Sequence, residues 1–359
     1  MSTKPDSMVI TAKITGIKYT PKMGRALNTY HFSSLEKALS TEASFLLMLD
    51  NGNTIAVSWW VSPKRTRSYP YTRVYDTLYF PGKKITIIPI FKDEGADGDR
   101  DFLQWDTVSL MSLLGVYVII GYYTSASRNP NYKNKITDQR FDIEFLKWQI
   151  NEILSYQSDA LHWNLCQIDS AAKLAKKALE AYEYISSKLG VQMHSSKSAL
   201  QRISELLKGK ENFIAYSRTL AKKAQLRETI TNQPKERLTG SKAPIVITNY
   251  LGGAYYFTVD EARLQNRKLL LIEGKHTKNN RLPSLDDIKD GLLKMILYTN
   301  LTNVVVDSKK VLSVAVLLLT TGPSVNYEQL LMDKNFELLK EEAKINGFLI
   351  MLNDEYIQL

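Results

Sequence analysis

The stretch Lys268-Leu-Leu-Leu-Ile-Glu-Gly-Lys275 decides how the C-terminal part of the chain is interpreted. Its four consecutive apolar residues, Leu269 to Ile272, are typical of a central β-strand that is covered on both faces. Because residues i and i+2 of a strand point to the same face, Glu273 and Lys275 are expected to project together. Charges at the end of a buried strand are costly unless they pair or bind an ion. The stretch therefore predicts either a functional charge pair or an ordinary strand that ends in solvated charges.

The residues just before this stretch predict a second strand and a hairpin. Ala254–Ala262 is rich in aromatic and β-branched residues, and Leu264–Arg267 is typical of a polar turn. With the turn near residue 265, Asp260 is expected roughly opposite Leu271 and close to Glu273. Carboxylate ligands of this kind suit Mg²⁺. The neighbouring lysine would orient or deprotonate an attacking water, or stabilise the charge that develops on a phosphate.

This pattern resembles a known catalytic signature. Asp260, followed thirteen residues later by Glu273-Gly-Lys275, is similar to the motif of the PD-(D/E)XK nuclease superfamily, and within it to type II restriction endonucleases. The resemblance implies that Asp260, Glu273 and Lys275 are catalytic and that Asp260 and Glu273 bind Mg²⁺. The family often has proline directly before the first acid, where this chain has Val259. A one-residue register slip would make Glu261 the inward acid instead, so both acids stay open as the first metal ligand.

The order of the expected elements fits the αβββαβ core of this superfamily over roughly residues 200–359. They are a helix-like stretch before Pro234, a strand at Pro244–Asn249, the two hairpin strands, a helix from Leu285 to about Leu297, a strand at Val311–Leu319, a helix near Tyr327–Lys344 and a strand at Phe348–Leu352. Ser284-Leu-Asp-Asp287 matches a capping box at the start of the fourth of these elements.

The rest of the chain predicts a β-rich part followed by a helical part. The expected N-terminal strands are Val9–Lys18, Ser44–Leu49, Thr54–Val61 and Lys84–Phe91, before an exposed acidic loop at Asp93–Asp101 and a mostly helical stretch from Phe141 to Gln233. We therefore predict an α+β (mixed α-β) protein with three segments. Residues 1–100 are the β-rich DNA-recognition domain, residues 101–238 the helical linker or dimerisation region, and residues 239–359 the restriction-endonuclease-like catalytic domain.

Composition favours a polyanionic partner inside a reducing compartment. Lys and Arg number 47 against 37 Asp and Glu, a formal net charge of +10. A single cysteine, Cys166, excludes an internal disulfide framework and a cysteine-rich zinc site, which fits the cytoplasm. Met1–Asp6 is polar, unlike a signal peptide, and the apolar stretch Leu110–Tyr123 is too short to span a bilayer. We expect no membrane association, and no nucleotide cofactor because no glycine-rich phosphate loop follows a strand.

Basic residues interleaved with aromatic ones predict where DNA is held. Arg and Lys neutralise phosphates, Arg reads guanine edges, and Tyr donates to phosphate or stacks on a base. Pro63 and Pro70 suggest that the first of these segments is a loop that projects from the β-rich domain. An exposed hairpin with a buried pair of tryptophans, Trp59 and Trp60, is the alternative. The candidate residues are Lys64, Arg65, Arg67, Tyr69, Tyr71, Arg73, Arg128, Lys133, Lys278 and Arg281.

Three hypotheses for function follow from these observations. The first is a Mg²⁺-dependent, sequence-specific endonuclease that cleaves double-stranded DNA. A homodimer is expected, because one chain holds one expected catalytic centre and two would cut both strands; a monomer that cuts the strands in turn is the alternative. The second is a structure- or damage-directed nuclease with the same core. The third is a non-catalytic DNA-binding protein in which the charge pair is structural.

Overall fold

The structure is a computed structural model that describes residues 8–64, 70–207, 215, 218–219, 222–223, 225, 241–250, 253–323, 330, 332–353 and 355–359. The chain forms two compact units. The first unit consists of Met1–Arg25 together with Arg218–Leu359, and the second unit of Ala26–Ser217. This division differs from the three predicted segments: the N-terminal strand lies with the C-terminal part, and residues 101–217 share a unit with the β-rich residues before them.

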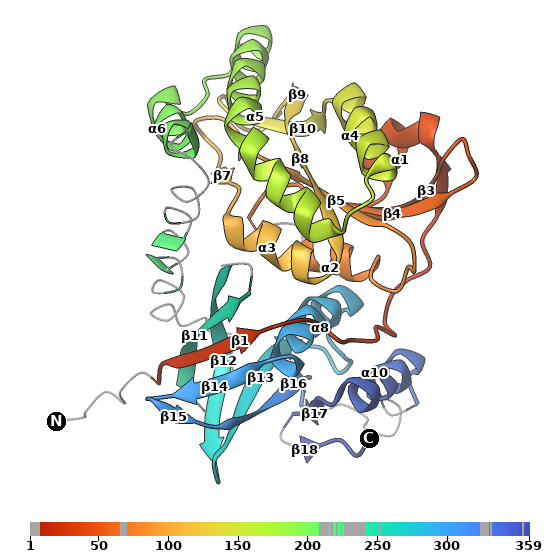
Figure 1. The fold of residues 1–359 in the computed structure, drawn as a ribbon, viewed down its shortest axis with the longest axis vertical. Coiled ribbons are helices and arrows are strands. Elements are labelled where there is room, and N and C mark those ends of the chain that lie inside the picture. Colours follow the sequence, from red (N-terminus) through yellow and green to blue (C-terminus); the bar gives the residue numbers. More distant parts are fainter. Residues whose placement is uncertain are drawn as a thin grey trace, which may run out of the picture. The chain divides into compact units, whose positions relative to one another are not determined.

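The described residues of the first unit form a nine-stranded sheet in the order β15-β14-β1-β11-β12-β13-β16-β17-β18 (Figure 1). The strands are β1 (Ile10–Ile14), β11 (Ser241–Asn249), β12 (Ala254–Gln265), β13 (Lys268–His276), β14 (Thr302–Val306), β15 (Lys309–Lys310), β16 (Leu312–Thr320), β17 (Leu349–Leu352) and β18 (Glu355–Tyr356). Strands β11, β12 and β13 are antiparallel neighbours, whereas β13, β16 and β17 run parallel. The strands predicted at residues 244–249, 254–262, 311–319 and 348–352 are confirmed.

Strand β1 joins this sheet from the other end of the chain. Ile10 pairs with Ile245 in a parallel arrangement with β11, and with Val306 in an antiparallel arrangement with β14. Its alternating pattern, with Ile10, Ala12 and Ile14 buried, is that of a strand with one covered face. A strand was predicted at Val9–Lys18, and the structure confirms its first half, Ile10–Ile14. Its partner β11 lies more than two hundred residues away in the sequence.

The core of the first unit lies on both faces of β13. Leu269, Leu270, Leu271 and Ile272 are all buried, as expected for a covered central strand. On one face, Leu270 and Ile272 form a cluster with residues of β16 and β17. Helix α8 (Leu285–Thr299) packs against β13 and β16.

Capping interactions mark the ends of the helices α8 and α10 (Lys334–Asn346), which follow β13. The side chain of Ser284 accepts a hydrogen bond from the Asp287 N–H and donates one to the Asp287 carboxylate, which confirms Ser284 as the predicted N-cap of α8. Helix α10 begins after Asp333, whose side chain caps it, and ends at Gly347 in a left-handed conformation. Part of the helix predicted near residues 327–344, like the stretch before Pro234, lies outside the described residues.

The described residues of the second unit form a five-stranded sheet in the order β2-β3-β4-β5-β8, and two separate hairpins. The strands of the sheet are β2 (Thr29–His31), β3 (Ser44–Met48), β4 (Thr54–Trp59), β5 (Lys84–Pro89) and β8 (Val116–Gly121). The hairpins are β6 (Phe91–Asp93) with β7 (Arg100–Phe102), and β9 (Tyr123–Arg128) with β10 (Ile136–Phe141). The helices described in the second unit are η1 (Phe32–Ser34), α1 (Leu35–Thr41), α2 (Pro70–Tyr75), α3 (Trp105–Leu113), α4 (Ile143–Ser155), α5 (Ala160–Leu189) and α6 (Ser196–Leu207). The predicted strands at residues 44–49, 54–61 and 84–91 are confirmed, as is helical structure in the described part of residues 141–233.

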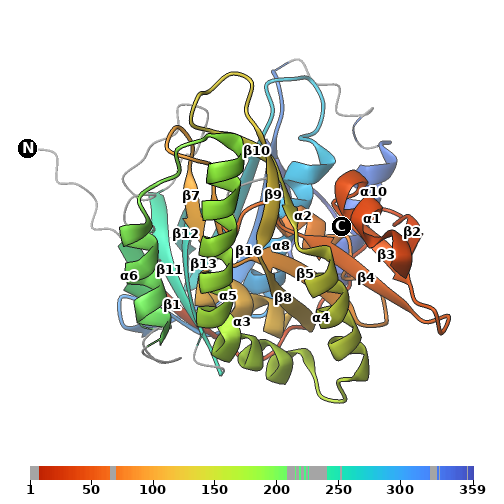
Figure 2. The same cartoon turned by 90° about the horizontal axis from the view of Figure 1, so that it is seen from above.

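Helix α5 covers the end of the sheet, where it lies along β8 and β9 (Figure 2). The Asn164 side chain accepts from the Val118 N–H at 2.7 Å, and Trp163 Nε1 donates to the Val118 carbonyl at 2.8 Å. The edge of β8 is therefore satisfied by side chains of a helix instead of a further strand.

One expectation for the second unit was wrong in part. Within the acidic segment 93–101, residues 94–99 connect β6 to β7 and include the exposed Ala96, Asp97 and Asp99, as expected of a loop, whereas Asp93 is buried in β6. The β-rich N-terminal part also contains the helices α1 and α2. The apolar stretch 110–123 is core, shared between α3 and β8.

At the level of fold class, the protein is a mixed α/β protein, as predicted. None of the helices described by the structure combines the length and the apolar character needed to cross a membrane.

Candidate active site

The hairpin β12–β13 sets which side chains meet at the site. It turns through Asn266 and Arg267, both in the left-handed region with φ of 48° and 65°. The turn is therefore centred slightly later than predicted. In consequence Leu271 pairs with Ala262, and not with Asp260 as expected.

The corrected register brings the two acids of the motif closer than predicted. Glu261 pairs with Ile272, so Asp260 is the next residue along β12 and lies beside Glu273. Asp260 Oδ2 accepts a hydrogen bond from the Gly274 N–H at 3.0 Å. The acid that shares a face with Glu273 is thus Asp260.

Glu261 lies on the opposite face of the hairpin, because alternate residues of a strand point to opposite sides. Its side chain is fully buried and forms an ion pair with Arg263. This places Glu261 away from Glu273, so of the two acids that the sequence left open only Asp260 shares the face of Glu273.

The carboxylate of Glu273 is buried between two ammonium groups. Its Oε1 lies 3.0 Å from Lys275 Nζ, and its Oε2 lies 2.6 Å from Lys294 Nζ. Lys275 Nζ also lies 2.7 Å from Asp290 Oδ2. The site therefore joins Asp260, Glu273 and Lys275 of the hairpin with two charged residues of α8.

Sequence reasoning missed Asp290 and Lys294, since α8 was interpreted as a packing helix only. Their spacing of four residues, which puts both on one face of a helix, was the available signal. That signal is ambiguous by itself, because an i,i+4 acid–lysine pair is also common on solvated helix faces. Only the packing of α8 on β13 shows that this face meets the site.

Gly291 explains how α8 comes so close to Lys275. A Cβ atom at this position would lie 2.9 Å from Leu317 Cδ1 and 3.1 Å from Lys275 Cε. Glycine in the interior of a helix costs about 1 kcal/mol relative to alanine. The structure places it where any side chain would push against the lysine of the motif.

The two carboxylates have pKa values that are displaced in opposite directions. Burial and the negative charge of Glu273 raise the pKa of Asp260 to about 7. Burial alone would also raise the pKa of Glu273, but the ammonium groups of Lys294 and Lys275 outweigh it and lower that pKa to about 2. Near neutral pH the site therefore holds one firmly ionised carboxylate beside a second that ionises with difficulty.

Both lysines remain charged despite their burial. Burial lowers the pKa of Lys275, but Glu273 and Asp290 more than offset this, so its pKa lies above the ordinary value. The pKa of Lys294 is likewise raised, because Glu273 and Asp260 outweigh its desolvation. Each side chain acts as a fixed positive charge and not as a proton acceptor near neutral pH.

The two carboxylates of the site suit a hard divalent cation that needs only one or two ligands from the protein. Among the residues that the structure describes, no group of three or more His, Cys, Asp and Glu side chains is arranged to hold a metal. Asp260 and Glu273 nevertheless lie side by side. Burial, and after it the negative charge of Glu273, raise the pKa of Asp260, and a bound cation would offset both effects. Mg²⁺ is commonly held by one or two carboxylates, with water and phosphate oxygens completing its shell.

Lys278 and Arg281 lie just beyond the motif strand and are exposed. Arg281 lines a pocket of about 490 Å³ with His276, at the end of β13, and Ser284, at the start of α8. The His276 ring is held by the Thr320 hydroxyl, at 2.6 Å from its Nδ1. These two predicted DNA-binding cations therefore belong to the same unit as the site.

The described end of the predicted DNA-binding segment 64–73 is a helix and not a projecting loop. Tyr71 and Arg73 belong to helix α2, where Tyr71 is buried against Trp60. Arg73 lies over the Trp59 ring at 4.5 Å and donates to the Trp59 carbonyl at 2.9 Å. Both side chains therefore pack within the second unit instead of projecting from it.

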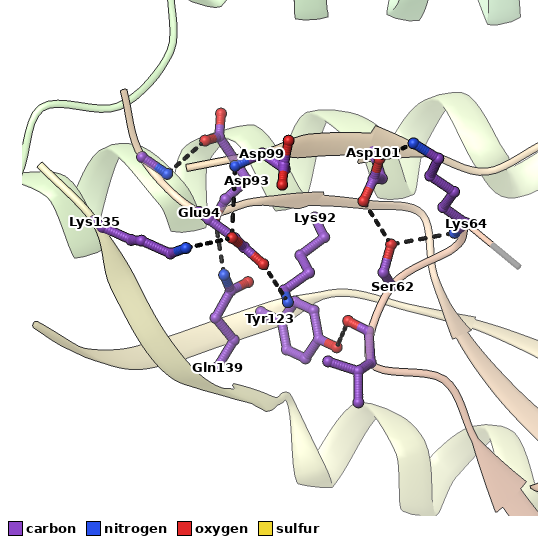
Figure 3. Close-up of polar contacts among 12 residues, drawn as sticks. Ser62, Lys64, Lys92, Asp93, Glu94, Asp99, Asp101, Tyr123, Lys135 and Gln139 are labelled. Carbon is purple, nitrogen blue, oxygen red and sulfur yellow. Dashed lines mark hydrogen bonds and ion pairs between the residues drawn. The ribbon is translucent and has the colours of Figure 1, made fainter. Parts of the chain in front are cut away.

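Lys64 is exposed but has an acidic partner. Ser62 Oγ donates to Asp101 at 2.8 Å, and Lys64 Nζ lies 3.9 Å from the same carboxylate (Figure 3). Arg65, Arg67 and Tyr69 lie outside the described residues.

Arg128 and Lys133 are exposed on the hairpin β9–β10 and its connection. This hairpin is fixed to the β6–β7 hairpin by a charged cluster in which Glu94 binds both Lys92 and Lys135, at 2.8 and 3.2 Å (Figure 3). These contacts tie the hairpin that carries the two exposed cations to the β6–β7 hairpin.

Comparison of the chain with protein-family models, with curated proteins and with solved structures gives no match.

Proposed function

We propose that this protein is a Mg²⁺-dependent endonuclease that hydrolyses phosphodiester bonds in double-stranded DNA at specific sequences, in the manner of a type II restriction enzyme. The observation that carries the proposal is the convergence of Asp260, Glu273 and Lys275 on one face of the hairpin β12–β13. The antiparallel neighbours β11, β12 and β13, followed by α8 and the parallel strand β16, are consistent with the αβββαβ core of the PD-(D/E)XK superfamily.

Each residue of the site has a role in this proposal. When bound, Mg²⁺ supplies a Lewis acid for the phosphate and lowers the pKa of a coordinated water. Asp260 and Glu273 would hold the ion through carboxylate oxygens. Lys275 stays protonated, so we assign it to stabilising negative charge on the phosphate and not to removing a proton from water.

DNA as the substrate agrees with the net charge of +10 and with the exposed cations. Lys278 and Arg281 follow the catalytic strand and would contact phosphates near the cleaved bond. The exposed cations Arg128, Lys133 and Lys64 would supply further contacts from the second unit. We further propose a homodimer that acts in the cytoplasm, with two sites for the two strands of the duplex.

The deciding experiment is cleavage of plasmid DNA by the purified chain with Mg²⁺ or with a chelator. Discrete fragments that require Mg²⁺ support the proposal, whereas a smear indicates a structure- or damage-directed nuclease. Binding without cleavage under any divalent ion indicates a non-catalytic DNA-binding protein.

Two substitutions on the same hairpin make a matched pair for this assay. Glu273→Gln removes a buried carboxylate within the site, and Glu261→Gln removes one on the opposite face. We expect Glu273→Gln to abolish cleavage, and Glu261→Gln to retain cleavage in proportion to the folded fraction. Loss of cleavage in folded Glu261→Gln with activity left in Glu273→Gln would refute the assigned site.

The proposed dimer is tested by sedimentation of the chain with and without its DNA. Two protomers on one duplex, at concentrations that support full cleavage, are the expected result. One protomer per duplex under the same conditions would refute the dimer and leave the chemistry of the site intact.

A further inference from the structure

Lys294 is a charged residue in an apolar stretch of α8. Its neighbours Leu292, Leu293, Met295 and Ile296 are buried, and the Lys294 side chain itself is only 19% exposed. Burying an ammonium is costly unless it is paired. The position of Lys294 is therefore explained by what its charged end contacts.

That contact is the second oxygen of Glu273. Lys294 Nζ lies 2.6 Å from Oε2, while Lys275 Nζ lies 3.0 Å from Oε1. Both oxygens of the carboxylate are thus engaged by ammonium groups. Lys275 has a second partner in Asp290, but the only acid within ion-pair distance of Lys294 among the described residues is Glu273.

Counting the charges of the site shows which of the two ammonium groups has no negative charge to balance it when a divalent ion is bound. Asp260, Glu273 and Asp290 carry three negative charges when ionised. One divalent cation and Lys275 carry three positive charges and balance them. Lys294 would then add an uncompensated positive charge within a buried site, next to the ion that shares its carboxylate partner.

We propose that Lys294 is a competing cation at this site, whose ammonium occupies Glu273 until a divalent ion displaces it and which thereby weakens divalent-ion binding. This inference rests on the proposed function, because it concerns the same carboxylates. It assigns Lys294 a part in setting the concentration of divalent ion at which the site fills, and no contact with the phosphate.

The test is calcium binding to the full chain, measured by titration calorimetry without DNA. Calcium is a hard, oxygen-seeking cation like Mg²⁺, and the readout does not depend on turnover. Lys294→Met keeps the length and apolar stem of the side chain and removes the charge. Lys268→Met, at the exposed start of the same strand β13, removes a charge outside the site.

We expect Lys294→Met to bind Ca²⁺ at least about tenfold more tightly than the native chain, and Lys268→Met to bind it equally. Lys294→Gln, which can still donate a hydrogen bond to Glu273, is expected to fall between them. This second variant carries the test if Lys294→Met fails to fold, as judged by near-ultraviolet circular dichroism.

Equal or weaker Ca²⁺ binding by the folded Lys294 variants, with clear binding by the native chain, would overturn the inference and leave the metal site in place. Absence of divalent binding in every folded form would instead overturn the proposed Mg²⁺ dependence, and the inference with it. The two failures are therefore distinguishable in one set of titrations.

Discussion

Asp260→Asn should stabilise the first unit near neutral pH in the absence of metal. The substitution replaces a carboxylate whose ionised form is disfavoured by burial and by the charge of Glu273 with a neutral amide of the same shape. The amide oxygen can still accept the hydrogen bond that Gly274 N–H donates to Asp260. Function and stability are thus expected to oppose each other at this residue, since the carboxylate is proposed to bind the ion.

The size of the effect follows from the pKa of Asp260, which is raised from 3.8 to about 7 by burial and by Glu273. A raised pKa means that the folded state binds the proton more tightly than the unfolded state. The stability due to this proton is complete below about pH 4 and is lost as the pH rises through 7. Between pH 5 and 7 the loss amounts to at most about 3 kcal/mol, less after allowance for the partial exposure of Asp260.

Glu273 does not change its protonation state in the pH range in which Asp260 titrates, so it does not contribute to the pH dependence there. Its pKa is lowered to about 2, so its contribution to stability is present above pH 4.5 and disappears only as the pH falls through 2. The difference in unfolding free energy between Asp260→Asn and the native chain should therefore grow by about 1–3 kcal/mol from pH 5 to pH 8.

The assay must report on the first unit by itself. All five tryptophans lie between residues 59 and 163, so tryptophan fluorescence follows the second unit and serves as the internal control. Hydrogen exchange of peptides from β12 and β13, followed by mass spectrometry with a chelator present, reports the local opening free energy at the site. Parallel pH profiles for the variant and the native chain would refute the electrostatic account of Asp260.

Three further predictions concern packing and DNA contact. Gly291→Ala should reduce the unfolding free energy of the first unit by about 1–3 kcal/mol and lower the proposed cleavage, because the added methyl crowds Lys275. Gly16→Ala, where nothing lies within 4 Å of the added atom, should change neither. Replacing Arg128 and Lys133 together by alanine should make the slope of log K for DNA binding against log salt concentration shallower by about two units, one per phosphate contact. An unchanged slope in filter-binding titrations would show that these two residues do not contact DNA. Arg73→Ala should destabilise the second unit by about 1–3 kcal/mol in urea unfolding followed by tryptophan fluorescence, and unchanged stability would show that its contacts over a tryptophan ring and with a carbonyl contribute nothing.

Local patterns in the sequence were sufficient to predict the elements that carry the site. The apolar run before Glu273 predicted a covered central strand, and Ser284 predicted the start of α8; both are confirmed. These predictions succeed because burial and capping leave a signature within a few neighbouring residues. The motif itself, Asp260 with Glu273 and Lys275, was also readable from spacing along one hairpin.

The register of that hairpin was decided by its turn. Asn266 and Arg267 both adopt the left-handed conformation, which moves the pairing so that Leu271 faces Ala262. A polar tetrapeptide predicts that the chain turns but not which two residues occupy the tightest positions. The identity of the inward acid depends on this detail, since a shift by one residue exchanges the two faces of a strand.

Only the tertiary structure decided which distant segments complete the sheet and the site. Strand β1 pairs with β11 across more than two hundred residues, and α8 brings Asp290 and Lys294 against Glu273. Hydrophobic periodicity states that a face is buried and does not state what buries it, because apolar attraction is non-directional. Which charges meet on a helix and a strand therefore depends on how the whole unit packs, and no local stretch of sequence contains that information.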